Sequence, residues 1–203
     1  MKVRLWTIQN EQGWNELQTK GIYTGKKEFI TPEFILGYDW LRAQMEQRIG
    51  KSKNPEQYPV WAWYQSIDDK RKKPDLRTSG HLPSGEVGYR IEFEKDEKEI
   101  LLSDFVLWHW SLCYHDYIAD SEEEAISFDE EKERKNIRGF LSGHLEELSS
   151  SFQTKIKKSW EKIFDMNFDL EYYTDSYHEK KIQATFWELK KQEIIKVDKF
   201  IAR

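Results

Sequence analysis

Residues 58–65 read YPVWAWYQ, and this stretch decides the fold class of the chain. Small or apolar side chains alternate here with the two large rings of Trp61 and Trp63. A period of two residues, with aromatic and β-branched positions and Pro59 near its start, is typical of a β-strand. The chain therefore contains a sheet, and the remaining segments are interpreted around this strand.

Four further segments are predicted to be strands. Residues 3–8 (VRLWTI) and 89–93 (YRIEF) alternate in the same way. Near the C-terminus, residues 182–189 (IQATFWEL) and 193–202 (EIIKVDKFIA) are separated by a short polar link. That spacing predicts a C-terminal β-hairpin.

Helices are predicted between the strands. Asn10 is placed to cap a helix that ends at Gly21, and Thr31 to cap a second helix, with apolar residues every three or four positions, that ends at Gly50. Ser103 is interpreted as the cap of a third helix. The remaining segments with helical periodicity are residues 106–118, 137–152 and 156–168.

Together these elements predict one α+β domain over residues 1–203. Its sheet is expected to be mixed or antiparallel, with N- and C-terminal strands and several packed helices. Within it, residues 119–135 form an acidic segment that is predicted to be a mobile loop or the start of a solvated helix.

Composition excludes several classes of protein. The 37 acidic residues outnumber the 32 basic ones, and the net charge of -5 makes nucleic acid an unfavourable partner. Cys113 is the only cysteine and the five histidines are scattered, so neither a disulfide nor a metal site is predicted. No apolar stretch is long enough for a membrane span or a signal peptide, and a cytoplasmic protein is expected.

The 30 aromatic residues offset this polarity, because they can form a core or line a ligand site. Indole rings near basic and amide side chains are suited to a nucleotide, whose base stacks and whose phosphates pair with guanidinium groups. The ordinary alternative is a core strand followed by a solvated loop. The residues predicted to bind such a ligand are Trp6, Trp61, Trp63, Arg77, Arg90 and Gln183.

No catalytic constellation is recognised in the sequence. Glu188, His109 and Asp104 are the groups whose chemistry would suit catalysis. Each has a structural alternative: Asp104 can cap a helix, and a histidine between two tryptophans is more often hydrogen-bonded in a core.

Six motifs in one order resemble an uncharacterised bacterial domain-of-unknown-function family, the one numbered thirty-eight forty-one. The resemblance covers nearly the whole chain, and the family name carries no activity. The motifs are LWTIQ, YDWLRAQM, PVWAWYQ, KPDLR, LLSDFVLWHW and QATFWELKKQEIIKVDKFIAR.

More distantly, the order of elements resembles ADP-ribosyltransferase-like domains. This resemblance implies NAD as a cofactor, Gln183 at the opening of a late strand, and a catalytic glutamate at the place where this chain has Thr185. Glu188 is then the substitute further along, and Arg4 the group that would anchor NAD. The expected function is binding of an NAD- or ADP-ribose-like ligand without the usual catalysis.

Two alternatives from other classes stay open. The first is a non-enzymatic interaction or regulatory protein whose acidic run, residues 121–133, contacts a basic protein partner. The second is an RNA-binding module, against which the net charge of -5 counts.

Overall fold

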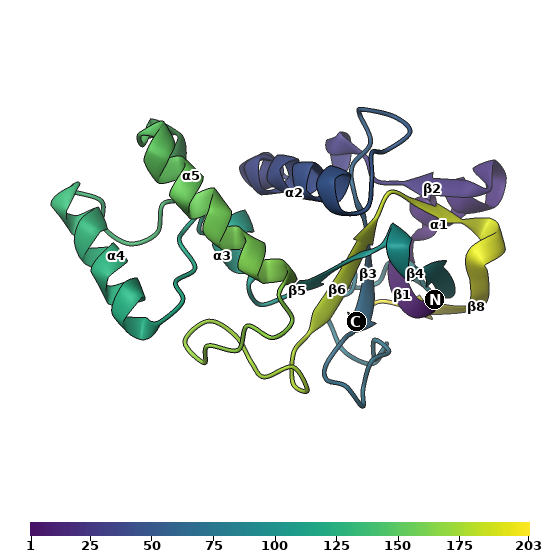
Figure 1. Ribbon diagram of the computed structural model, residues 1–203. Coiled ribbons are helices and arrows are strands. Elements are labelled where there is room, and N and C mark those ends of the chain that lie inside the picture. The colour runs from purple at the N-terminus through teal and green to yellow at the C-terminus, as the bar shows by residue number, and fades with distance from the viewer.

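An antiparallel sheet of six strands organises the computed structural model, which describes residues 1–203 (Figure 1). The strand order is β5-β6-β3-β1-β4-β8, so the predicted α+β class is confirmed. A separate pair joins β2 to β7. The strands are β1 Lys2–Asn10, β2 Ile22–Thr24, β3 Val60–Gln65, β4 Val87–Asp96, β5 Leu101–Asp104, β6 Ile182–Phe186, β7 Glu188–Lys190 and β8 Ile194–Ile201.

Five α-helices accompany the sheets. Figure 1 shows α3, α4 and α5 gathered beyond the β5 end of the sheet, with α1 at the opposite side. No helix is long and apolar enough to cross a membrane. The helices are α1 Glu11–Lys20, α2 Ile35–Arg48, α3 Trp108–Leu112, α4 Glu122–Arg134 and α5 Ser150–Ser159.

The predicted boundaries of α1 are confirmed. The Asn10 side chain accepts a hydrogen bond from the Gly13 amide, which satisfies one of the free N–H groups at the helix start. Gly21 ends the helix with φ 73°, a left-handed conformation that glycine adopts without strain. The ring of Trp14 stacks on Tyr89 of β4 at 5.0 Å, so α1 covers one face of the sheet.

The start of α2 differs from its predicted form. Thr31 makes no side-chain capping bond, and a 3-10 turn over Pro32–Phe34 precedes the α-helix. The proline still occupies the first helical position, where its missing N–H costs nothing. The chain therefore enters α2 through a tighter turn instead of a hydroxyl cap.

The predicted C-terminal hairpin is wrong. β6 pairs with β3 and β5, whereas β8 pairs with β4 at the other edge of the sheet. Between them, β7 leaves the main sheet to pair with β2. β6 and β8 each pair with strands that are distant in the sequence. The short link between the two segments therefore did not predict their partners.

Ser103 does not cap a helix, which corrects a second prediction. It lies in β5, and its hydroxyl accepts a hydrogen bond from the Trp108 indole at 2.8 Å. Asp104 takes the capping role, because its Oδ1 accepts from the amides of Val106 and Leu107. The helix itself is only α3, shorter than the predicted residues 106–118.

Two apolar clusters hold these elements together. The smaller one lies between the sheet and α1 and includes Leu5, Leu17 and Phe93. The larger one joins the helices to the β5 end and includes Leu41, Trp108 and other aromatic residues. The acidic segment forms α4, which buries Phe128 and keeps most of its carboxylates exposed.

The turn after α3 carries a strained histidine. His115 has φ 51°, a left-handed conformation uncommon for residues other than glycine. Its side chain is buried and its Nε2 has no hydrogen-bond partner. Burial lowers the pKa of His115; nearby Lys157 also lowers it, and Glu146 and the Leu112 backbone oppose the shift.

We expect this burial to make stability fall in mild acid. Above about pH 6.5, the histidine is neutral in both the folded and unfolded states and contributes no pH dependence. Below that pH the unfolded state takes up the proton more readily, so the free energy of unfolding decreases until the lowered folded pKa is passed. Urea unfolding at pH steps between 8 and 5 measures this decrease.

His115→Asn is the matched variant, because asparagine tolerates the left-handed backbone and does not titrate. The variant should lose the part of the decrease that begins near pH 6.5. An identical pH profile for both proteins would show that His115 is not its source.

Candidate ligand site

A pocket opens where the pairing between two central strands stops. β1 pairs with β4 along its whole length, but with β3 only where Trp6 lies opposite Trp63. Beyond that pair a side chain replaces the backbone ladder, since Thr7 Oγ1 donates to the carbonyl of Trp61 at 2.8 Å. A pocket of about 330 Å³ lies here. Ligand pockets of about 300–1,000 Å³ are the usual size for small molecules.

The walls of this pocket are aromatic and polar but carry no carboxylate. Among its 18 lining residues there is no aspartate or glutamate, in a chain that has 37 of them. The lining therefore places no negative charge against an anionic ligand. The aromatic members are Tyr23, Phe29, Tyr38, Tyr58, Trp61 and Trp63, and the side chains with polar groups are Thr7, Gln9, Lys26, His81 and Gln183.

One wall depends on a glycine at the end of β2. Gly25 forms an isolated bridge to Tyr58, and a Cβ on Gly25 would lie 2.3 Å from the backbone oxygen of Pro59. No side chain fits in that space. The close approach brings Tyr23 and Phe29, from either side of Gly25, to the pocket lined by β3.

Tyr38 and Trp61 form the wall on the α2 side. Their rings meet edge to face at 6.0 Å. Burial raises the pKa of Tyr38, and the side chain of Trp61 offsets part of that rise. Tyr38 is therefore a neutral phenol at physiological pH, able to donate a hydrogen bond.

The two basic side chains of the pocket are already engaged. Lys26 Nζ lies 2.6 Å from Glu16 Oε2, outside the lining. Burial would raise the pKa of Glu16, but hydrogen bonds from Lys26 and Lys20 lower it below its usual value. His81 Nε2 lies 2.8 Å from the Asp75 carbonyl, which leaves its other ring nitrogen for a ligand.

Three of the six residues predicted to bind a ligand meet in this pocket: Trp61, Trp63 and Gln183. Trp6 does not line it, although it lies opposite Trp63 in the sheet. Its ring is buried and its Nε1 has no partner.

The two predicted arginines lie outside the pocket and are neutralised elsewhere. Arg90 donates to Asp198 at 2.6 Å and to the carbonyl of Pro74. The hydrogen bond from Arg90 lowers the pKa of Asp198 to about 2. Arg77 is 81% exposed and pairs with Asp75 at 2.6 Å. Neither arginine meets Gln183 in the pocket.

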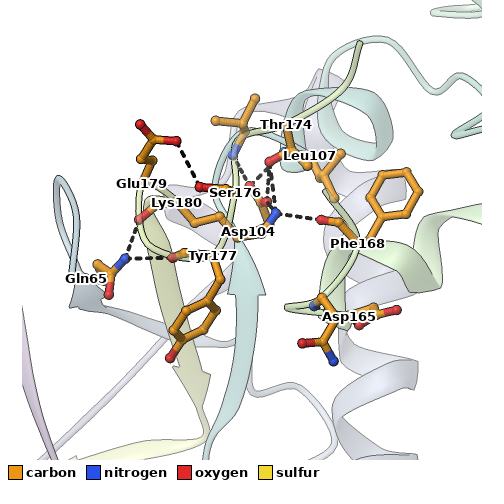
Figure 2. Close-up of polar contacts among 12 residues, drawn as sticks. Gln65, Asp104, Leu107, Asp165, Phe168, Thr174, Ser176, Tyr177, Glu179 and Lys180 are labelled. Atoms are coloured by element: carbon orange, nitrogen blue, oxygen red, sulfur yellow. Dashed lines mark hydrogen bonds and ion pairs between the residues drawn. The ribbon is translucent and has the colours of Figure 1, made fainter. Parts of the chain in front are cut away.

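The candidates for catalysis are also occupied by structural contacts. Asp104 is fully buried and bonded to Lys180 and Thr174 (Figure 2). His109 is exposed and its Nδ1 lies 3.0 Å from the Val106 carbonyl. None of these groups lines the pocket.

Glu188 does not take the place of the missing glutamate in this pocket. It lies in β7 and pairs with Lys53 at 2.6 Å. Burial would raise the pKa of Glu188, but the hydrogen bond from Lys53 lowers it below its usual value. Thr185 is fully buried, with its hydroxyl directed to the Leu101 carbonyl, and Arg4 pairs with glutamates on β4.

Eight of the aromatic and polar residues that line the pocket were not predicted to bind a ligand: Thr7, Gln9, Tyr23, Lys26, Phe29, Tyr38, Tyr58 and His81. Gln9 continues the alternation of β1 and Tyr38 lies on the inner face of α2, so both resembled ordinary core or surface positions. The one local signal was Gly25 following two residues after Tyr23, which marks a close approach of backbone.

Comparison with known proteins gives a family and no activity. A family model described as Domain of unknown function (DUF3841) matches residues 4–195. No curated protein and no solved structure matches the chain.

Proposed function

The chain belongs to the DUF3841 family, a domain of unknown function, and from that premise we propose that it binds a nucleotide-type ligand in the pocket between β1 and β3. The ligand class is NAD- or ADP-ribose-like, with a planar base and a ribose inside the pocket. The proposal concerns binding and assigns no reaction.

One observation carries the proposal: an aromatic pocket without carboxylates in a protein whose net charge is -5. Nucleobases stack on aromatic side chains, and each such contact is worth about 1–3 kcal/mol where it has been measured. An anionic phosphate would be repelled by aspartate or glutamate at this position, and none lines the walls. The pocket therefore suits a nucleobase and does not repel the phosphate groups attached to its ribose.

The same geometry favours binding over group transfer. A glycosidic bond is broken with the help of a carboxylate or another group that stabilises the developing positive charge on the sugar. Glu188 and Asp104 are held elsewhere, and Thr185 is buried in the sheet. In the proposed ADP-ribosyltransferase-like arrangement, Gln183 lies beside the ligand, and NAD is recognised without being cleaved.

The protein-partner hypothesis has one observation in its favour. On α4, Ile126 is 61% exposed among the exposed carboxylates of Glu122, Glu123 and Glu130. An apolar side chain surrounded by acids suits a basic protein surface better than a small molecule. Binding of a basic protein partner is therefore the second candidate function. RNA binding, which the net charge disfavours, is the third.

Titration calorimetry tests the proposed function. We expect wild-type protein to bind ADP-ribose or NAD, and Trp63→Ala to weaken binding about tenfold or more, because it removes a stacking surface of about 1–3 kcal/mol.

Tyr172→Ala, an exposed aromatic outside the pocket, is the matched control and should bind like wild type. No heat with NAD, ADP-ribose or adenosine at millimolar ligand would refute the proposal.

A further inference from the structure

Gln183 is a pocket residue whose side-chain amide makes no hydrogen bond within the protein. It is the second residue of β6 and lies opposite Trp63 on one side and Ser103 on the other. Its neighbours in the strand, Ile182 and Ala184, are fully buried, whereas Gln183 is half-buried and lines the pocket. No protein group hydrogen-bonds its amide, and the Ser103 hydroxyl already accepts from Trp108.

Other glutamines near the sheet donate hydrogen bonds to protein groups, although the buried Oε1 of Gln65 accepts none. Gln65 donates to the carbonyls of Tyr177 and Lys180, and Gln57 donates to the carbonyl of Trp187. Within the pocket, Gln9 donates to Thr7 Oγ1 at 2.9 Å. A half-buried polar group without a protein partner is expected to meet water or a ligand.

Trp63 provides a flat surface next to this amide. Directly opposed residues on antiparallel strands place their side chains on the same face, about 5 Å apart. Phe105 packs against the Trp63 ring at 5.2 Å and supports it. The ladder between β3 and β6 shifts register just after Trp63, an irregularity of the kind that redirects side chains near binding sites.

From this juxtaposition we infer that Gln183 reads the edge of a planar ring stacked on Trp63, and this inference rests on the proposed function. The amide offers a donor and an acceptor side by side, so it pairs with a ligand edge that carries an acceptor beside an N–H donor. Adenine has such an edge, and so does the carboxamide of nicotinamide. The ligand class is therefore a base or ring amide with that edge unblocked.

Calorimetry with four probes tests the inference. Adenosine is compared with N6,N6-dimethyladenosine, and nicotinamide riboside with its N,N-dimethylcarboxamide analogue, which keeps the ring charge and lacks the amide donor. For the probe that binds, we expect the blocked analogue and the Gln183→Met variant each to weaken affinity about tenfold or more. The blocked analogue should lose no further affinity in the variant, because the contact is already absent.

Two controls test whether Gln183 contacts the ligand or only stabilises the fold. Gln47→Met, at an exposed position on α2, should bind like wild type. Gln183→Met should unfold at the same or higher temperature than wild type, because it removes an amide that no protein group satisfies. A lowered unfolding temperature would instead identify Gln183 as a structural residue.

The possible results distinguish failure of the inference about Gln183 from failure of the proposed nucleotide binding. If wild type binds adenosine or nicotinamide riboside, but neither the blocked analogue nor Gln183→Met weakens that binding, the inference is overturned and the pocket remains a nucleoside site. If wild type binds none of the four probes, both are overturned. If Gln183→Met no longer distinguishes a probe from its blocked analogue, the result supports both the inference and the proposed function. Whichever probe binds, adenosine or nicotinamide riboside, then shows which ring Gln183 contacts.

Discussion

Replacing Lys180 by methionine is expected to lower the free energy of unfolding by about 3–5 kcal/mol. Lys180 and Asp104 are both fully buried, with side-chain exposures of 0%, and their charged atoms lie 2.7 Å apart. Removing the lysine leaves the carboxylate of Asp104 in the interior without its countercharge. Since small domains are stable by only about 5–15 kcal/mol, the variant should be close to unfolding.

Every donor of the Lys180 ammonium is used, as Figure 2 shows. Besides Asp104 it donates to the carbonyl of Phe168 at 2.8 Å and to the hydroxyl of Thr174 at 3.2 Å. Thr174 in turn donates to Asp104. The cluster fastens the segment before β6 to the end of β5.

A double variant separates the effect of an unpaired buried charge from the effect of altered side-chain packing. Asp104→Asn with Lys180→Met removes both charges while keeping an oxygen that can accept from the Val106 amide. We expect it to recover much of the stability lost in the single variant, measured by urea unfolding. Lys181→Met, at an exposed neighbouring position, should change little. A single variant no less stable than this control would contradict the account.

The second large effect is expected at Trp160. Its side chain is fully buried, the Trp40 ring meets it edge to face at 5.4 Å, and its indole donates to the Asp116 carbonyl at 2.7 Å. Trp160→Ala should therefore cost about 3–5 kcal/mol, from lost apolar contact and the cavity left behind.

Trp160→Phe is the informative partner, because it keeps a ring in the cluster and removes the indole N–H. It should be less destabilising than the alanine variant, by equilibrium denaturation. The control is Tyr172→Ala, whose ring is 56% exposed. If all three variants unfold alike, Trp160 is not a centre of the helical core.

The local signals of the sequence were sufficient for strands and for some helix ends. Alternation located β1, β3 and β4, and Asn10 and Gly21 bounded α1 as expected. The local signals did not predict which strands pair. β6 and β8 were assigned to one hairpin, yet three other strands separate them in the sheet. Which strand an apolar segment joins depends on the whole core, since sequence neighbours and distant strands offer the same hydrogen bonds.

The candidate site was predictable to a similar extent. Trp61, Trp63 and Gln183 were found because they share strands with polar neighbours, and the sheet brings them to one pocket. Arg77 and Arg90 were chosen for their charge, but Asp75 and Asp198 satisfy them at short range. Asp75 is a local partner, two residues from Arg77, whereas the partner of Arg90 lies 108 residues away and is brought to it only by folding.

The most direct test of the central claim, that the pocket between β1 and β3 binds a nucleotide-type ligand, is to follow the tryptophan indole signals of isotope-labelled protein by NMR during titration with ADP-ribose. The signals of Trp61 and Trp63 should shift in a saturable way, while that of Trp160, buried in the helical core, stays in place. No shift at millimolar ligand, or shifts confined to tryptophans outside the pocket, would contradict it.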